Sequence, residues 1–237
     1  MDIYSKIIHF ERSWSSVHVR VLYSDDYFFI CEKPVGISSE SPGLPDLLAE
    51  QTGRCFWPVH RLDTGTRGVT VLACSSESSA LIQKAFQQQS VRKEYLAVVS
   101  GYPDQTAGIY TDLLFHDRKK NKSYVVDSVR TGVKKASCEW TLVDSMVQSD
   151  NTFSLIRIRL HTGRTHQIRV QFASRGYPLI GDRRYGSRIK AYAPSLWSSF
   201  ISLPHPCQTD LTVEASSDPP RIFPWDLFPD YDYSICK

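Results

Sequence analysis

Residues 60–68 place one carboxylate, Asp63, between Arg61 and Arg67 in a turn that also contains two glycines. A carboxylate held in a turn can take a proton from a substrate or attack an electrophilic carbon. Taken alone, an aspartate beside arginines more often caps its turn and pairs with a neighbouring guanidinium. The segment by itself therefore leaves a catalytic and a structural interpretation open.

A second polar segment, residues 161–170, follows a predicted strand at 153–160. Thr165 is a suitable N-cap, and the pattern predicts a helix over residues 166–175. Arg164 would then lie at the helix N-terminus, beside backbone N–H groups that favour an anion. A guanidinium there can hold a buried carboxylate through two parallel hydrogen bonds, although a lone arginine in such a segment is more often on the surface.

Residues 91–99 alternate between polar and apolar side chains, which predicts a strand that ends near Gly101. Tyr95 shares one face of this strand with Lys93 and Ala97. On the pattern alone, Tyr95 is an ordinary, half-buried aromatic residue of a strand.

The remaining patterns predict the scaffold that positions these residues. One helix follows Pro45 and stops at Gly53, and another begins after Ser75 or Ser76. Many strands, few helices and no strand–helix–strand alternation predict an α+β fold around a central, mixed and mostly antiparallel sheet flanked by a few helices and loops. The tail from Pro204 is predicted to be irregular.

Without repeats or linkers, residues 1–237 are predicted to form a single domain with residues 1–16 as a lead-in. The other predicted strands are residues 17–21, 27–31, 69–73, 109–115, 123–126 and 136–143.

Positive charge is unevenly distributed along the chain. The formal net charge is only +3, yet residues 151–190 contain nine arginines and lysines against a single acid, Asp182. A second basic group lies in residues 118–135, while acids collect after residue 210. A surface of this kind suits a phosphate backbone, so the charge pattern favours RNA or DNA as a partner.

Composition also disfavours several classes of protein. The six cysteines include no Cys-x-x-Cys pair, which argues against a zinc ribbon and a disulfide scaffold. His161 and His166 have no nearby residues to complete a set of ligands, so we expect no metal. No signal-peptide pattern and no run of 18 apolar residues is present, which predicts a soluble, cytoplasmic protein without membrane contact.

Four segments, in this order, closely resemble the signature motifs of the RluA family of RNA pseudouridine synthases. The resemblance runs from about Val21 to the region of Pro219 and Pro220, and its first and third motifs are the most specific. The motifs are His60-Arg61-Leu62-Asp63-x-x-Thr66-x-Gly68, Arg92-Lys93-x-Tyr95-x-Ala97-x-Val99-x-Gly101, Thr162-Gly163-Arg164-Thr165-His166-Gln167-Ile168-Arg169 and Gly181-Asp182-x-x-Tyr185-Gly186.

The resemblance implies an enzyme that isomerises specific uridines in structured RNA, tRNA or rRNA, to pseudouridine without metal or cofactor. It implies a cleft between two halves of a mixed sheet, with Asp63 as the catalytic residue. A paired uridine must be flipped out of its helix before it can react, and Tyr95 then lines the pocket against the base. By the same match Arg164 pairs with Asp63. An arginine beside the carboxylate favours its charged form, whether Asp63 takes a ribose proton to give a glycal or attacks the sugar.

The match also assigns residues around that centre. Ile168 supplies an apolar wall of the pocket, Arg61 fills the gap left by the extruded nucleotide, and His60 belongs with them to the substrate-binding set. Nothing in the sequence resembles a dimerisation helix, so a monomer is expected.

The sequence departs from the family at Arg67, where serine is usual, and in the run after Gly68, where leucines are usual. Residues before Val17 leave no room for the small RNA-binding domain that many relatives carry. Two other functions stay open at this stage. One is an RNA-binding module of the same fold without catalysis, and the other is a glycosidase, which needs a second carboxylate near Asp63.

Overall fold

The computed structural model describes residues 17–232, so the predicted lead-in, residues 1–16, lies outside the described range. The helices are α2 (Leu44–Thr52), α3 (Ser76–Gln87) and α4 (Gln167–Ala173), with short 3-10 turns at Arg183–Tyr185 and Trp225–Leu227. The strands are β1 (Val21–Ser24), β2 (Phe28–Lys33), β3 (Trp57–Pro58), β4 (Arg67–Ala73), β5 (Arg92–Ser100), β6 (Ala107–Asp117), β7 (Lys122–Val126), β8 (Val133–Gln148), β9 (Asn151–Leu160), β10 (Leu196–Pro204) and β11 (Thr212–Ser216).

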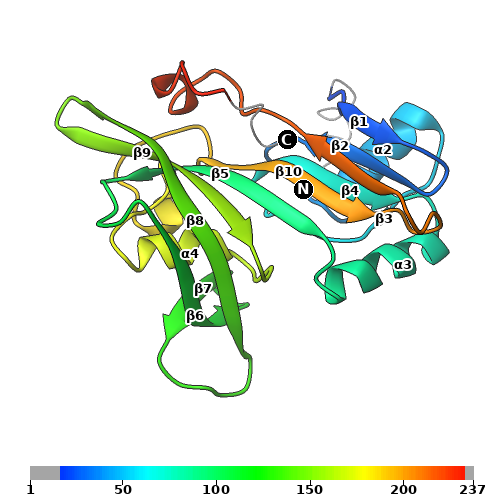
Figure 1. The fold of residues 1–237 in the computed structure, drawn as a ribbon, viewed down its shortest axis with the longest axis horizontal. Helices are drawn as coiled ribbons and strands as arrows, with labels where there is room; N and C mark the ends of the chain where they lie inside the picture. Colours follow the sequence, from blue (N-terminus) through cyan, green and yellow to red (C-terminus); the bar gives the residue numbers. More distant parts are fainter. Residues whose placement is uncertain (1–16, 233–237) are drawn as a thin grey trace, which may run out of the picture.

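All eleven strands belong to one sheet, whose main order is β1-β2-β4-β10-β5-β9-β8-β6-β7 (Figure 1). β3 pairs with β4, and β11 pairs with β10. Only the β4–β10 pair is parallel, and the other pairs between named strands are antiparallel. The prediction of an α+β fold with a mixed, mostly antiparallel sheet is confirmed.

The helices cover different parts of the sheet. In the half formed by β1, β2 and β4, alternate side chains point to opposite faces, as the two-residue repeat of a strand requires. One face packs against α2 through Leu44, Leu47 and Leu48, and the other packs against Ile82 of α3. In the half formed by β5, β9 and β8, α4 packs through Ile168 and Phe172. The sequence predicts α2 and α3 well, including the Ser75 cap of α3.

The two halves meet where β4 runs beside β10, at a contact that only glycine permits. Gly68 has a φ of +104°, and a Cβ atom there would lie 2.2 Å from the carbonyl oxygen of Ser198. L-amino acids with side chains rarely adopt this backbone conformation. Gly68 therefore sets how closely the Asp63 turn, which leads into β4, can lie against β10.

The patterns in the sequence do not predict β10, and the expectation of an irregular tail from Pro204 is wrong because β11 lies within it. Serines interrupt the apolar run of β10, so its periodicity is weak. In the fold these serines are buried and hydrogen-bonded: the Ser198 hydroxyl donates to the Val69 carbonyl at 2.9 Å, and the Ser199 hydroxyl donates to the Glu94 carbonyl at 3.2 Å. The hydroxyl groups of β10 thus find their hydrogen-bond partners on β4 and β5, which are distant in sequence.

Among residues 17–232, no helix combines the length and apolar character needed to cross a membrane.

Candidate active site

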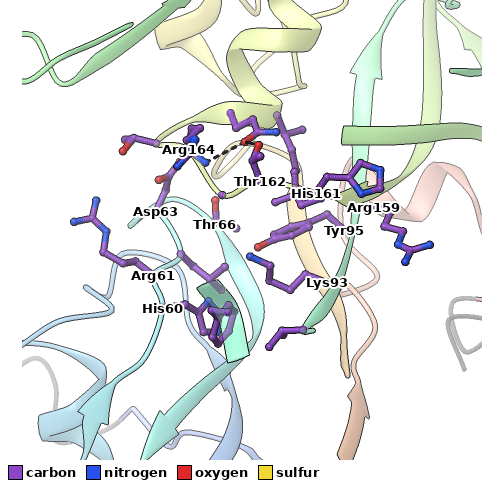
Figure 2. Close-up of a pocket in the computed structure, with 18 of the residues that line it drawn as sticks. His60, Arg61, Asp63, Thr66, Lys93, Tyr95, Arg159, His161, Thr162 and Arg164 are labelled. Atoms are coloured by element: carbon purple, nitrogen blue, oxygen red, sulfur yellow. Dashed lines mark hydrogen bonds between the residues drawn. The ribbon is translucent and has the colours of Figure 1, made fainter. Parts of the chain in front are cut away.

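A cavity of about 800 Å³ lies where the Asp63 turn faces β5 and the segment that joins β9 to α4 (Figure 2). The first three sequence motifs meet around it. The lining includes Asp63 and Thr66 from the first, Lys93 and Tyr95 from the second, and Arg164 to Arg169 from the third. The segments that the sequence analysis singled out are thus neighbours in space.

Asp63 is the only carboxylate among the described residues that line this cavity. Its side chain is 22% exposed, and its Oδ2 atom lies 3.2 Å from Nη1 of Arg169 and 3.7 Å from Nε2 of His166. Its other side faces the cavity. A lone carboxylate in this position lacks the second acid that a glycosidase needs.

Arg169 is buried between two aspartates. Its Nε and Nη2 atoms donate to the two carboxylate oxygens of Asp182 at 2.6 and 2.9 Å, while Nη1 donates to Asp63. The guanidinium also lies 5.1 Å from the centre of the Tyr185 ring. Burial alone would lower the pKa of Arg169, but hydrogen bonds and charge from Asp182, joined by Asp63, raise it. The two-bond fork expected from the sequence exists, but it links Arg169 to Asp182.

The prediction that Arg164 pairs with Asp63 is wrong. Arg164 is exposed, and its Nε atom donates to the backbone carbonyl of Lys135 on β8 at 3.0 Å. It still lies on the wall of the cavity. The partner of Asp63 is Arg169, five residues later in the same motif.

The start of α4 explains this difference. His166 adopts a left-handed backbone conformation with φ of 56°, so the helix begins at Gln167 and Thr165 does not cap it. The Gln167 side chain instead accepts hydrogen bonds from the Arg164 backbone N–H and the Thr162 hydroxyl. His166 and Arg169 then lie three residues apart, on one side of the helix, and both face Asp63. The predicted end of the helix is also wrong, because α4 stops at Ala173.

The His166 ring contacts the Tyr185 hydroxyl through its Nδ1 atom. The Tyr185 hydroxyl accepts a hydrogen bond from the Ser123 backbone N–H at 2.8 Å and lies 2.9 Å from Nδ1 of His166. The ring is thus oriented with Nδ1 toward the Tyr185 hydroxyl and Nε2 toward Asp63. Burial lowers the pKa of His166 to about 4, against a smaller opposing effect of Asp63. A neutral imidazole therefore faces the carboxylate, with its Nε2 atom at 3.7 Å.

Tyr95 and Ile168 both line the cavity. Both are buried, with 5% and 3% of their surface exposed, and they belong to one apolar cluster. Burial raises the pKa of Tyr95, with a smaller opposing effect from a hydrogen bond with Ser198. Tyr95 thus presents a neutral phenol to the cavity.

Lys33 is a site residue to which the sequence analysis gave no role. Its side chain is buried, and its ammonium group donates to the carbonyls of Pro34 and Ile37, each at 2.9 Å, and lies 3.5 Å from the carbonyl of Thr64. Burial lowers the pKa of Lys33 to about 8, although the charge of Asp63 acts in the opposite direction. Lys33 ties the end of β2 to the Asp63 turn. Its place just before Pro34 and a glycine was the only signal in the sequence.

His60 and Arg61 make contacts within the protein. The His60 Nε2 atom accepts a hydrogen bond from the Val71 N–H at 3.1 Å, and its ring lies 4.9 Å from that of Phe86. The Arg61 side chain is exposed, lies 3.4 Å from Glu40, and points away from Tyr95 (Figure 2). His60 therefore supports the cavity wall, while Arg61 is available at its edge.

Arg67, which the sequence could not place, does not line the main cavity. Its guanidinium lies 5.4 Å from the centre of the exposed Tyr192 ring. No group of three or more potential metal ligands is present among residues 17–232.

The histidines that line the cavity, His60 and His166, predict a stability that falls in mild acid. The pKa of His60 is lowered by burial, and then by the charge of Lys93, to about 3, and that of His166 to about 4. The unfolded chain therefore binds protons below pH 6.5 that the folded chain does not, so stability rises with pH in this range. Each histidine should contribute a slope of up to about 1.4 kcal/mol per pH unit between its folded pKa and 6.5.

Urea unfolding at pH 7.5 and pH 5 tests this prediction. His60→Gln and His166→Asn should each reduce the difference in stability between the two pH values. Exposed His18 provides the matched control, since His18→Gln should leave the difference unchanged. If the two buried-site variants keep the full difference, other groups are responsible for it.

The sequence comparisons point to one family. The model of the RNA pseudouridylate synthase family matches residues 27–174. The dual-specificity RNA pseudouridine synthase RluA of Escherichia coli strain K12 is 31% identical over 212 residues, covering 84% of this chain and 93% of that protein. The tRNA pseudouridine synthase C of Pasteurella multocida is 28% identical over 242 residues, covering 88% of this chain and 98% of that protein.

Solved structures share the fold. Human RNA Pseudouridylate Synthase Domain Containing 1 aligns with a TM-score of 0.74 at 21% identity, covering 86% of this chain and 85% of that one. Human RNA Pseudouridylate Synthase Domain Containing 4 aligns with a TM-score of 0.72 at 20% identity, covering 95% and 97%. Since the family model spans more than half of the chain and RluA matches most of it, the chain belongs to the RluA family of RNA pseudouridine synthases and is a pseudouridine synthase, an isomerase.

Proposed function

We propose that this enzyme isomerises a specific uridine in structured RNA, either tRNA or rRNA, and that Asp63 is its catalytic residue. The observation that supports this most directly is the position of Asp63. It is the lone carboxylate of the described cavity lining, it is held by Arg169 and faced by His166, and it shares the cavity with Tyr95.

Asp63 has to act as a carboxylate. Both possible routes, removal of a ribose proton to give a glycal and direct attack on the sugar, need its negative charge. Arg169 supplies a positive charge at 3.2 Å, and its own position is fixed by Asp182. The carboxylate is thus oriented by a group that does not itself have to move.

The cavity is suited to a nucleotide that has left its helix. Tyr95 and Ile168 provide apolar surface for a base, and stacking returns part of the few kcal/mol needed to extrude it. Arg164 and Arg61 lie at the cavity edge, where exposed guanidinium groups can reach RNA phosphates.

The choice of tRNA or rRNA rests on the charge pattern and on the relatives. One of them is described as acting on tRNA and another as having dual specificity. The exposed basic residues of positions 151–190 would supply the positive charge for either RNA; they are Arg159, Arg164, Arg183, Arg184, Arg188 and Lys190.

Release of tritium from RNA labelled at uridine C5 tests the proposal, because isomerisation removes the hydrogen at that carbon. We expect the protein to release label from tRNA or rRNA prepared from cells that lack it. Folded protein that releases no label from either RNA would contradict the proposed substrates. Release of label only from another class of RNA would support the isomerisation but exclude tRNA and rRNA as substrates.

A further inference from the structure

A positively charged side chain, Lys93, lies in the cavity without a negatively charged partner. It is located on β5, two residues before Tyr95, so the two side chains share one face of the strand. Figure 2 shows both side chains projecting from β5 to the same side, toward the Asp63 turn. Lys93 is therefore placed beside the aromatic ring that faces the base in the proposed function.

The surroundings of Lys93 are apolar or neutral. Its ammonium group lies 5.1 Å from the centre of the Phe86 ring, and burial lowers its pKa. No carboxylate within the described residues lies within ion-pair distance of it, since Asp63 pairs with Arg169 and Glu94 pairs with Arg92. A partly buried ammonium without an anion is costly, which suggests that a ligand brings the negative charge.

In the proposed function, the reaction produces such a charge on a base held in the cavity that Lys93 lines. When the bond between ribose C1′ and uracil N1 breaks, its electron pair leaves with the base, and the negative charge spreads over N1 and the two carbonyl oxygens. Either the C2′ proton moves to Asp63 and a C1′–C2′ double bond forms, or an Asp63 oxygen bonds to C1′. After the base turns, its C5 atom bonds to C1′. In the same step Asp63 gives its proton back to C2′, or the bond from Asp63 to C1′ breaks and its electron pair returns to the carboxylate. C5 then loses its proton to water, and N1 takes up a proton from water.

We propose that Lys93 stabilises the uracil anion by placing its ammonium group against a carbonyl oxygen of the detached base. A fixed donor aimed at charge that develops only during the reaction accelerates bond cleavage without strengthening substrate binding. Phe86 and the wall formed by His60 hold the ammonium group in place. This role rests on the proposed function and adds a substrate-contacting residue to it.

Contact with an RNA phosphate is the competing role for Lys93. The exposed guanidinium groups at the cavity edge, such as Arg164, are better placed for phosphates. The two roles predict different kinetic effects. Stabilisation of the anion acts on the rate at saturation, whereas a phosphate contact acts on affinity and on its dependence on salt.

Lys93→Met keeps the length of the side chain and removes its charge, and Lys93→Arg restores a charge. Lys84 on α3, which is exposed and does not line the cavity, provides the matched control Lys84→Met. With the RNA that releases tritium, Lys93→Met should lower the single-turnover rate at saturating enzyme by about 10²-fold to 10³-fold. Lys93→Arg should recover a large part of this loss, and Lys84→Met should match the wild-type protein.

Binding is measured in the Asp63→Asn background, where the RNA is not turned over. There Lys93→Met should change the dissociation constant by less than about threefold and leave its salt dependence unchanged. A wild-type rate for Lys93→Met would overturn the inference. Weaker binding with a salt slope reduced by about one, at an unchanged saturating rate, would assign Lys93 to a phosphate instead.

A fluorine substituent distinguishes a chemical role from a loss of packing. Fluorine at uracil C5 stabilises the anion, so cleavage depends less on Lys93, and the loss in Lys93→Met should shrink when consumption of 5-fluorouridine RNA is followed. An equal loss on both RNAs would contradict a role in stabilising the base. Tritium release by the wild-type protein tests the proposed function separately. If the wild type is active and Lys93→Met is equally active, the role of Lys93 is rejected while the proposed function stands.

Discussion

Asp63→Asn should lower pseudouridine formation by about 10⁴-fold or more, because asparagine can neither accept the ribose proton nor attack the sugar as a charged oxygen. Asparagine has nearly the same shape as aspartate, and its amide oxygen can still face Arg169. Arg169 also keeps both hydrogen bonds to Asp182. We therefore expect the fold and the affinity for RNA to be largely retained.

Tritium release, thermal unfolding and RNA binding measured on the same preparation test this expectation. Glu50→Gln, which neutralises an exposed carboxylate on α2, serves as the control and should keep full activity. Activity in folded Asp63→Asn would remove Asp63 from the mechanism. Loss of activity together with loss of the fold would instead assign Asp63 a structural role.

Arg169→Met should inactivate and destabilise the protein, whereas Arg164→Met should leave its stability close to that of the wild type. Asp182 is 1% exposed and would lose both hydrogen bonds from the guanidinium. Removal of one partner from a buried ion pair typically costs about 3–5 kcal/mol. Arg164 is exposed and donates to a backbone carbonyl, so its loss should change the free energy of unfolding by about 0.5 kcal/mol or less.

Urea unfolding of the two variants gives a direct comparison, because both lose one guanidinium from the same motif. Addition of Asp182→Asn to Arg169→Met should restore part of the stability but none of the activity, since Asp63 still lacks its partner. If Arg164→Met proves the more destabilising change, the described pairing is incorrect.

The sequence predicted the position of the site carboxylate, Asp63, better than the identity of its arginine partner. Asp63 and Tyr95 lie in short motifs where a turn or a strand face determines the direction of the side chain. Arg164 was assigned to Asp63 by the family resemblance, and a regular helix after Thr165 would place it at the helix N-terminus. The left-handed conformation of His166, a residue without a glycine's freedom, moves the helix start and brings Arg169 to Asp63 instead. No local propensity predicts that conformation.

The fold shows the same division between local and distant causes. Helix α2 begins and ends at local signals, α3 begins at one, and these helices were predicted from them. Strand β10 lies inside the sheet, yet its serines weaken the apolar pattern that would predict a strand. The carbonyls of Val69 and Glu94 that accept their hydrogen bonds are more than 100 residues away. The pairing of Arg169 with Asp63 also joins residues more than 100 positions apart.

The position of Arg169 between two aspartates has a consequence for the reaction cycle. Arg169 and Asp182 together carry no net charge, so the formal charge of the three-residue group changes only with Asp63. When Asp63 becomes neutral, by taking up a proton or by bonding to the sugar, the guanidinium still has a full counter-charge in Asp182. In the proposed reaction, Arg169 therefore keeps a counter-charge throughout turnover. Asp63 can lose and regain its charge without a change in what surrounds Arg169.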